Sequence, residues 1–270
     1  MAALLEIDDL DVSFRGEDGV SVAAARDVSL KLDRGEVLGI VGESGSGKSS
    51  VAMSVPRLLP SPPAYWPKGR IMFGGRDVLK MDERELRSIR GSKIGVVFQD
   101  PMGSLSPLHR IGDQLAETVL LHERMSKASA RAQAVEWLGR VGIPDPAARA
   151  HAYPHELSGG MQQRVMIAMA LMLGPDLLIA DEPTTALDVT VQAQVLRLMR
   201  DLRKHSNSAV LLITHDLGVV SQMATRIMVM KSGRVVETSE DTAEFFRAPK
   251  HPYSQALVRE ARRMEPPEAK

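Results

Sequence analysis

A glycine-rich loop at residues 42–49 carries the residue types needed to hold a phosphate group. It reads Gly-Glu-Ser-Gly-Ser-Gly-Lys-Ser and follows an apolar run at 37–41 that is typical of a buried strand. Glycines let the backbone curl so that several N–H groups turn toward one phosphate. Lys48 places a positive charge on the outer phosphates and Ser49 offers its hydroxyl to Mg²⁺. The N-terminus of the following helix adds to the positive field.

We predict from this stretch that the chain binds a nucleotide. A chance turn of glycine and serine is the alternative, but it would not require a buried strand before the loop and a helix after it. The residues predicted to contact the nucleotide are Gly42, Glu43, Ser44, Gly45, Ser46, Gly47, Lys48, Ser49 and Ser50.

Two carboxylates stand where a predicted core strand ends. Asp181 follows four apolar residues, and ligands gather at the C-terminal ends of strands in open α/β sheets. There it can hold Mg²⁺, directly or through water, beside Ser49. Glu182 comes next and is suited to polarise the water that attacks the γ-phosphate. A strand-end aspartate can also only cap a helix, but the phosphate-binding loop in the same chain favours the metal role.

His215 and Gln99 also end apolar strands. Alone, such a histidine is more often structural, and the glutamine carries little weight. Next to a γ-phosphate, His215 can hydrogen-bond to it and hold the water and Glu182 in register. Gln99 can contact Mg²⁺ or the water, and it can report the nucleotide state to the helical stretch that follows. We predict Glu182, His215 and Gln99 as catalytic residues, and Ser49, Gln99 and Asp181 as metal ligands.

A second anion site is predicted at residues 157–164, which read Leu-Ser-Gly-Gly-Met-Gln-Gln-Arg. Ser158 stands at the cap position, and two glycines then open a long apolar helix. Bare N–H groups and the helix dipole therefore face any anion placed there. From spacing alone, an ordinary N-cap is equally consistent with this pattern.

The composition limits the classes of protein that the chain can belong to. Its 270 residues allow one large α/β domain, or a core with a smaller appended subdomain. Lys plus Arg and Asp plus Glu both total 34, so no basic field indicates a nucleic-acid partner. The absence of cysteine excludes disulfides and thiolate-held metals or clusters. We expect no signal peptide, and the longest apolar run, 165–173, is too short to span a bilayer.

Hydrophobic periodicity predicts an antiparallel β start and a long helical insertion. Apolar residues alternate over 5–14, and an extended pattern resumes after a turn. The first helix should stop or kink at Pro56. A loop is expected at 59–68 because it holds four more prolines, and Ser126 or Ser129 can cap a helix. The other predicted elements are strands at 70–73, 94–98, 177–180 and 209–213, a hairpin at 227–230 and 235–238, helices capped at Asp82 and Ser158, and mostly helix over 100–174.

Taken in order, the motifs resemble those of the nucleotide-binding subunits of ABC transporters. Besides the two glycine motifs, the resemblance rests on Leu178-Ile-Ala-Asp-Glu-Pro, Ala186-Leu-Asp and Thr214-His, and it covers nearly the whole chain. It implies a single ATP-binding domain over 1–270 with an α/β P-loop NTPase core and a mixed sheet. Three parts are expected within this domain. Residues 1–99 and 175–245 would form the ATPase core with the antiparallel β subdomain, residues 100–174 an inserted helical subdomain, and residues 246–270 a short C-terminal tail.

The resemblance also implies a dimer in which two subunits pack head to tail and ATP lies between them. Ser158, Gly159 and Gly160 would then contact the nucleotide of the opposite subunit, and Asp188 would cross the interface. Gln163 would belong to the same set of nucleotide contacts. By the same analogy Phe14 stacks on adenine, although an aromatic residue in a strand can also be part of the core.

A narrower resemblance is to the peptide and nickel importer branch of that family. It rests on Phe98-Gln-Asp-Pro-Met, on Ser106-Pro-Leu with Ile111-Gly-Asp-Gln, on the run at 181–194, and on His251-Pro-Tyr-Ser-Gln-Ala-Leu. Ser106 replaces the usual Asn, and Pro56 interrupts a helix that is usually continuous. Many peptide-type members carry a cysteine-rich extension after the His-Pro-Tyr segment; without cysteines, no iron–sulfur cluster is expected here.

This branch implies partners and a location. We expect two integral membrane permease subunits, contacted through the region around 99–111, and a sister ATP-binding subunit or a second copy. An extracytoplasmic solute-binding protein would act indirectly, and the chain would work at the cytoplasmic face of the inner membrane. Peptide is favoured over nickel as the solute by resemblance only.

Other classes of protein fit less well. ABC ATPases of DNA repair have a long coiled-coil insertion, but only 110 positions separate Lys48 from Ser158. Ribosome-acting members carry two cassettes in one chain, and here there is one. A lone P-loop kinase would leave the second glycine motif unexplained. We therefore expect no nucleic-acid partner.

Overall fold

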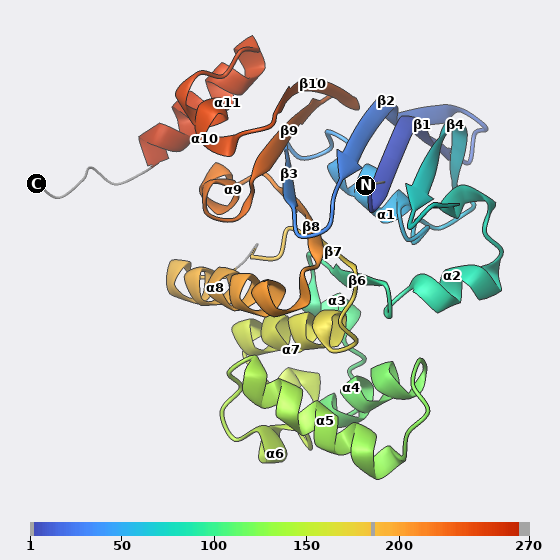
Figure 1. Ribbon diagram of the computed structural model, residues 1–270, viewed down its shortest axis with the longest axis vertical. Helices are drawn as coiled ribbons and strands as arrows, with labels where there is room; N and C mark the ends of the chain where they lie inside the picture. The colour runs from blue at the N-terminus through green and yellow to red at the C-terminus, as the bar shows by residue number, and fades with distance from the viewer. Residues whose placement is uncertain (1–2, 185–186, 265–270) are drawn as a thin grey trace, which may run out of the picture. The chain divides into compact units, whose positions relative to one another are not determined.

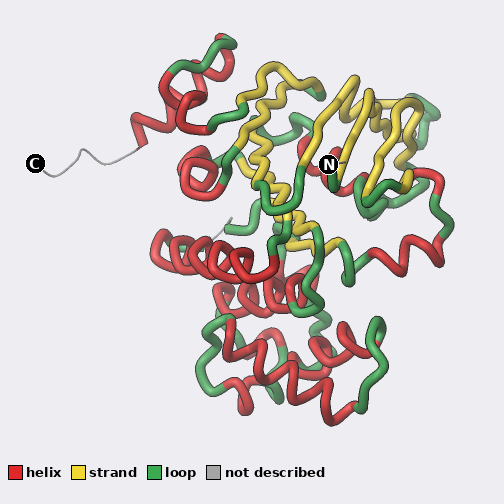
Figure 2. The backbone as a smooth tube through the Cα atoms, in the orientation of Figure 1, coloured by secondary structure: helices red, strands yellow, loops and turns green. Residues whose placement is uncertain are grey.

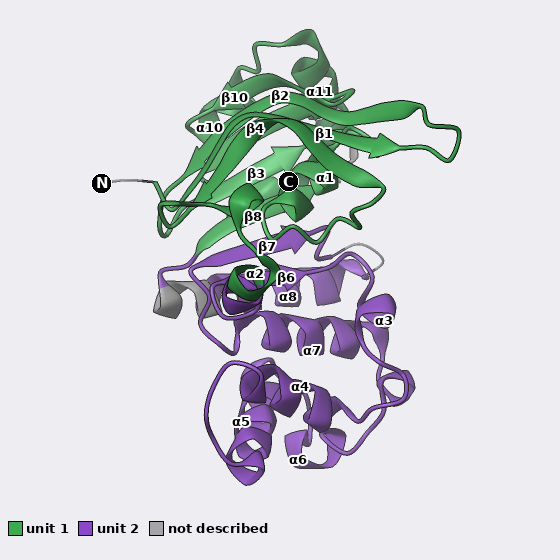
Figure 3. Ribbon diagram, turned by 90° about the vertical axis from the view of Figure 1, so that its right-hand side faces the viewer, with its two compact units in different colours: residues 1–86, 209–270 green, residues 87–208 purple. Residues whose placement is uncertain are grey.

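The computed structural model describes residues 3–184 and 187–264, and it divides the chain into two compact units. Unit 1 comprises residues 1–86 and 209–270, and unit 2 comprises residues 87–208 (Figure 3). In Figure 2 the strands of unit 1 are drawn in yellow, and unit 2 is mostly helical.

Unit 1 begins with an antiparallel sheet in the order β2-β1-β4-β5. The strands are β1 (Leu5–Arg15), β2 (Ser21–Leu32), β4 (Ala64–Phe73) and β5 (Arg76–Asp77). The apolar residues of β1 alternate with polar ones, and the apolar set is buried against the core. The predicted antiparallel start is therefore confirmed.

The predicted loop at 59–68 is wrong in its second half, because β4 begins at Ala64. The strand pairs with β1 through Ala64 opposite Phe14 and through Lys68 opposite Asp11. Between these pairs the register shifts, and Pro67 falls in the irregular part. A proline lacks the N–H that a regular ladder needs, but it is tolerated at such a bulge. Pairing with β1 thus outweighs the local preference of the prolines for a loop.

The second sheet of unit 1 is mixed and holds the phosphate-binding loop (Figure 1). It contains β3 (Val37–Val41), β8 (Ala209–Thr214), β9 (Arg226–Lys231) and β10 (Arg234–Ser239). β3 runs parallel to β8 and β9, and β9 and β10 form the predicted hairpin. Every residue of β3 and β8 is buried, as expected for parallel strands covered on both faces.

Short helices accompany these strands in unit 1. They are α1 (Lys48–Ser54), which ends before Pro56 as predicted, η1 (Val78–Lys80) and α9 (Leu217–Met223). α2 (Glu83–Ile89) continues into the start of unit 2. At its first turn the N–H of Glu85 donates to Asp82 and the N–H of Asp82 donates to Glu85, which is a capping box. The predicted cap at Asp82 is confirmed.

The C-terminal segment contributes to the core of unit 1. α10 (Thr242–Arg247) and α11 (Pro252–Met264) follow β10, and both lie beside α9 in Figure 1. Phe245, Tyr253 and Val258 pack into a buried cluster with Val41 of β3. The described part of the predicted tail is therefore packed against the strand that leads into the phosphate-binding loop.

Unit 2 combines two parallel strands with helices. The strands are β6 (Ile94–Val97) and β7 (Leu177–Asp181). A Cβ at Gly95 of β6 would lie 2.2 Å from the carbonyl oxygen of Ala170 in the helix at 159–171, so that helix packs closely on β6. Ser126 caps its helix, since the N–H of Ser129 donates to its hydroxyl. The helices are α3 (Pro101–Ser104), α4 (Ile111–Leu120), α5 (Lys127–Arg140), α6 (Pro146–Arg149), η2 (Pro154–Glu156), α7 (Gly159–Leu171) and α8 (Val189–Ser206). In the described part of the chain, no helix is long and apolar enough to cross a membrane.

Candidate nucleotide-binding site

The loop between β3 and α1 needs glycine at two positions because other backbone atoms approach it closely. A Cβ at Gly42 would lie 2.1 Å from the Met230 carbonyl oxygen, and one at Gly47 would lie 2.3 Å from the Ala24 carbonyl oxygen. Both residues also adopt positive φ angles, 150° and 97°, which disfavour any side chain. The loop therefore curls as a phosphate-binding loop must.

Lys48 is almost fully buried, with 4% of its surface exposed. Its ammonium group donates to the carbonyl oxygens of Gly42 at 2.7 Å and Glu43 at 2.8 Å. These bonds hold the positive charge within the curl of the loop. A buried ammonium acts more strongly on a phosphate than one in water, because the surroundings screen it less.

The turn between β9 and β10 supports the loop from outside, a feature that sequence reasoning missed. The N–H of Gly233 donates to the Ser46 carbonyl oxygen at 3.1 Å, and the Gly233 carbonyl accepts from the N–H of Arg26 at 2.8 Å. The sequence predicts a turn at Gly233, but Ser46, to which Gly233 donates, lies almost 190 positions away in the chain. Its role in the loop could not be inferred from spacing.

The other predicted site residues of unit 1 occupy varied environments. Glu43, Ser44, Gly45 and Ser49 are exposed, Gly47 and Ser50 are half-buried, and Ser46 is buried. His215 is exposed just after β8, where a strand-end group was predicted. Phe14 is half-buried in β1, paired with Val22 of β2 and Ala64 of β4.

In unit 2 the structure brings Gln99 and Glu182 together. Asp181 is buried at the C-terminal end of β7, and Glu182 follows with a positive φ of 47°. The Gln99 amide donates to a Glu182 carboxylate oxygen at 3.5 Å. A positive φ at a non-glycine residue costs free energy, and such strain is concentrated at functional sites. The positive φ of Glu182 therefore marks a strained backbone position at the end of β7.

Gln163 stabilises the segment that follows these carboxylates. Its side chain is buried, and its amide donates to the Pro183 carbonyl oxygen at 2.6 Å. The bond ties α7 to the segment directly after Glu182. In this structure Gln163 is thus placed to position that segment.

The second glycine motif opens α7. The Ser158 hydroxyl accepts from the N–H of Met161, so Ser158 is the N-cap. A Cβ at Gly159 would meet nothing within 4 Å, whereas one at Gly160 would lie 2.8 Å from Cγ1 of Val191. Packing against α8 therefore explains the glycine at 160. It does not explain the one at 159, whose surroundings leave room for a ligand.

This difference predicts opposite outcomes for two single-methyl substitutions. Gly160→Ala should lower the melting temperature of the chain, because overpacking costs about 1–3 kcal/mol. Gly159→Ala should melt at the parental temperature or slightly above it. Thermal unfolding followed by circular dichroism compares the two variants. Equal melting temperatures would contradict the contact with Val191.

Asp188 caps α8. Its carboxylate accepts from the N–H of Val191 at 2.9 Å, and its side chain is otherwise exposed. The sequence allows helix capping as the alternative role for Asp181. In the structure it is Asp188 that caps a helix in this way. Of the motif Ala186-Leu-Asp, Ala186 lies outside the described residues, as does Thr185.

The donors available for a cation are hard oxygens. Ser49 offers a hydroxyl, Asp181 a carboxylate and Gln99 an amide oxygen. Over residues 3–184 and 187–264, no three His, Cys, Asp or Glu side chains gather as a metal-binding set. Hydroxyl, carboxylate and amide oxygens are each suited to Mg²⁺, which is bound through one or two protein groups together with substrate phosphates.

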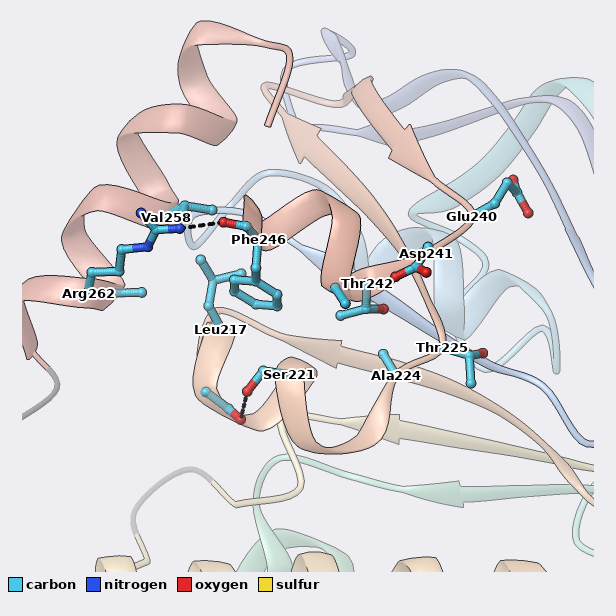
Figure 4. Close-up of a pocket in the computed structure, with 13 residues that line it drawn as sticks. Leu217, Ser221, Ala224, Thr225, Glu240, Asp241, Thr242, Phe246, Val258 and Arg262 are labelled. Atoms are coloured by element: carbon cyan, nitrogen blue, oxygen red, sulfur yellow. Dashed lines mark hydrogen bonds between the residues drawn. The ribbon is translucent and has the colours of Figure 1, made fainter. Parts of the chain in front are cut away.

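A groove lies between α9, α10 and α11 in unit 1, and no predicted site residue lines it. It has a volume of about 680 Å³ and is lined by Leu217, Phe246 and Arg262 among others (Figure 4). None of residues 42–50 lines it. Its walls are partly apolar, and the phosphate-binding loop lies outside it.

Comparison with known proteins decides the family. Residues 25–185 match the family model described as ABC transporter, which is more than half of the chain. The chain belongs to the ABC transporter family. It is an ATP-binding cassette, the ATPase of that family, and the expected α/β core with mixed sheet, antiparallel β part and helical part is confirmed.

Relatives named as peptide transport proteins cover most of the chain. The oligopeptide transport ATP-binding protein OppD of Bacillus subtilis is 51% identical over 94% of this chain and 71% of its own length. The dipeptide transport ATP-binding protein DppD of Escherichia coli K12 is 48% identical over 95% of this chain and 78% of its own length.

Solved structures of cassettes have the same fold. The ATP-binding cassette MJ0796, dimeric and bound to ADP and Pi, is 30% identical with a TM-score of 0.77, covering 87% of this chain and 97% of that one. CbiO1 of Clostridium perfringens, part of a CbiONQ transporter complex, is 26% identical with a TM-score of 0.76, covering 98% and 96%.

Proposed function

We propose that the chain is the ATP-hydrolysing subunit of a membrane importer for dipeptides or oligopeptides. The observation that carries the proposal is the identity of about half of all residues, over almost the whole chain, with relatives named for oligopeptide and dipeptide transport. Closure of a cassette dimer around ATP would drive solute uptake through the membrane subunits.

Each predicted site residue has a role in hydrolysis. Lys48 and the loop N–H groups hold the phosphates of ATP, and Ser49, Asp181 and Gln99 would hold Mg²⁺, which would supply positive charge beside the phosphates. Glu182 accepts a proton from the attacking water, and His215 and Gln99 keep the water in line. The bond between Gln99 and Glu182 supports their common task.

Two copies of the cassette, or this chain and a sister subunit, enclose the nucleotides head to tail. The open surroundings of Gly159 and the capping role of Ser158 support a ligand at the start of α7. Ser158, Gly159 and Gly160 then contact the opposite nucleotide, with Gln163 behind them and Asp188 at the interface. Phe14 stacks on adenine.

An exposed apolar surface of unit 2 supports contact with the permease subunits. Between β6 and α4, Phe98, Met102 and Leu108 expose 38%, 70% and 81% of their surfaces. Large apolar side chains exposed this closely in sequence are typical of a protein interface. Phe98 directly precedes Gln99, and Met102 and Leu108 lie within the segment 99–111, so nucleotide state at Gln99 reaches the partner there.

The partners are two integral membrane permeases, and an extracytoplasmic solute-binding protein acts indirectly. The chain works from the cytoplasmic face of the inner membrane. Uptake of a radiolabelled dipeptide and tripeptide tests the proposal in a strain lacking this gene. We expect uptake to be lost and to return with the parental gene, while uptake of nickel ions is unchanged. Peptide uptake at the parental rate in the deletion strain would contradict the peptide assignment.

The head-to-tail arrangement predicts which nucleotide responds to a change at Ser158. In a heterodimer with a sister ATPase, Ser158→Arg should damage the site built on the partner's phosphate-binding loop, because an arginine fills the space at the start of α7. ATP bound at Lys48 of the same chain should stay largely intact. Site-resolved photolabelling with an ATP analogue measures both sites.

The matched control is Ser126→Arg, which also removes a serine N-cap in unit 2, at the start of α5. It should leave the label at both sites unchanged. If Ser158→Arg removes the label from this chain's own loop and spares the partner's, Ser158 acts within one subunit and the head-to-tail arrangement is wrong for this protein.

A further inference from the structure

The His-Pro-Tyr segment at 251–253 has no role in the function proposed above, yet it reaches the phosphate-binding loop. The N–H of Glu43 donates to the hydroxyl oxygen of Tyr253 at 3.0 Å. The two residues are 210 positions apart and both belong to unit 1. Tyr253 is on the first turn of α11, so this helix is in direct contact with the loop.

The bond acts on the same peptide group that holds Lys48. The Gly42 carbonyl oxygen accepts from the Lys48 ammonium, and the N–H of Glu43 belongs to the peptide group of that carbonyl. A trans peptide is planar, so its C=O and N–H point in opposite directions. Tyr253 and Lys48 therefore hold one peptide plane from its two sides. Turning that plane would release both bonds together.

The Tyr253 ring is held firmly enough to orient its hydroxyl. Only 8% of the residue is exposed, and it packs in the cluster that contains Val41 and Phe245. The Lys231 ammonium lies 4.6 Å from the ring centroid, within range of a cation–π interaction. Burial raises the pKa of Tyr253 above its ordinary value, so the hydroxyl is neutral at physiological pH.

The start of α11 is fixed by β10. The Glu237 carboxylate accepts from the N–H groups of Lys250 and His251, both at 2.8 Å. Burial acts to raise the pKa of Glu237, but the hydrogen bonds to its carboxylate, first among them the one from the Lys250 N–H, together with the charge of His251, hold the pKa below its ordinary value. Nδ1 of His251 in turn accepts from the N–H of Tyr253 at 3.2 Å. The carboxylate therefore stays charged at neutral pH and anchors the turn that carries Tyr253.

The later part of α11 is fixed by α10. The Arg262 guanidinium donates to the Phe246 carbonyl oxygen at 2.6 Å, the bond drawn across the groove in Figure 4. α11 is therefore held both at its start and near its end. Because α11 is held at both places, it can fix the position of the phosphate-binding loop that it contacts.

We propose that Tyr253 is a positioning residue for the nucleotide site. Its hydroxyl fixes the peptide plane between Gly42 and Glu43, and through that plane it fixes the place of the Lys48 ammonium. Tyr253 touches no phosphate and acts only through the loop. The inference rests on the loop binding ATP, and it gives the C-terminal helix a part in setting the affinity for nucleotide.

Tyr253→Phe tests this because it removes one oxygen atom and leaves the ring packing and the Lys231 contact in place. The KM for ATP should rise about three- to tenfold, the range expected for one hydrogen bond. The kcat at saturating ATP should stay within about twofold, because the groups around the water are untouched. Without nucleotide, amide hydrogen exchange in a peptide covering residue 43 should become faster.

Tyr153→Phe is the matched control, since it makes the same single-atom change at a tyrosine of unit 2, directly before η2. It should leave KM and the exchange of residue 43 unchanged. If Tyr253→Phe keeps the parental KM and exchange while Lys48→Ala loses nucleotide, Tyr253 only packs α11 and the inference is wrong. If both variants bind ATP as the parent does, the loop itself is not the nucleotide site.

Discussion

Replacing Lys48 by alanine is expected to abolish ATP binding, or to weaken it at least about 100-fold. Each hydrogen bond from a charged group contributes about 1.5–3 kcal/mol, and the ammonium can make more than one to the outer phosphates. A tenfold loss of affinity corresponds to about 1.4 kcal/mol, so losing two such bonds accounts for the effect. Calorimetric titration with ATP and Mg²⁺ measures it.

Two further variants distinguish the loss of the Lys48 charge from a loss of folding. Lys48→Met keeps the length of the side chain in its buried position and should bind as poorly as Lys48→Ala. Lys80→Ala removes an exposed lysine of η1 in the same unit and should bind as the parent does. The melting temperature without nucleotide shows that each variant is folded. Parental affinity in a folded Lys48→Met variant would rule out the charge as the main contact.

The sequence predicted those parts of the site that depend on local pattern. Short apolar runs predicted β3, β7 and β8, and the same pattern placed Asp181, Glu182 and His215 at strand ends, where the structure has them. A phosphate-binding glycine-rich loop has a strand before it and a helix after it, so the sequence of the loop predicted both neighbouring elements. Such inferences work because strand ends and helix starts are fixed by neighbouring residues.

Other parts depend on residues that meet only in the folded chain. The contact of Tyr253 with the loop joins residues 210 positions apart, and no periodicity encodes it. Pairing with β1 draws Pro67 into a strand, although its own preference is for a loop. The crowding of Gly160 depends on Val191 of another helix. In each case long-range packing decides the structure, so local propensity could not reveal it.

Replacing Glu182 by glutamine should stop hydrolysis while leaving ATP bound. The amide has nearly the same shape as the carboxylate but cannot accept a proton from water. General-base catalysis typically contributes about 10²–10⁴-fold, so kcat should fall by that factor. The affinity for ATP should change little, because the phosphate contacts come from other residues. Release of phosphate measures turnover, and calorimetry measures binding.

The positive φ of Glu182 makes the substitution a clean test, because glutamine replaces it at the same backbone angle with the same number of side-chain atoms. Glu136→Gln, an exposed change on α5 of the same unit, should hydrolyse at the parental rate. Since Glu182→Gln leaves the ATP-bound state only slowly, the closed dimer with a sister subunit should accumulate and elute early in size-exclusion chromatography with Mg²⁺ and ATP. Hydrolysis by Glu182→Gln at the parental rate would show that another group activates the water.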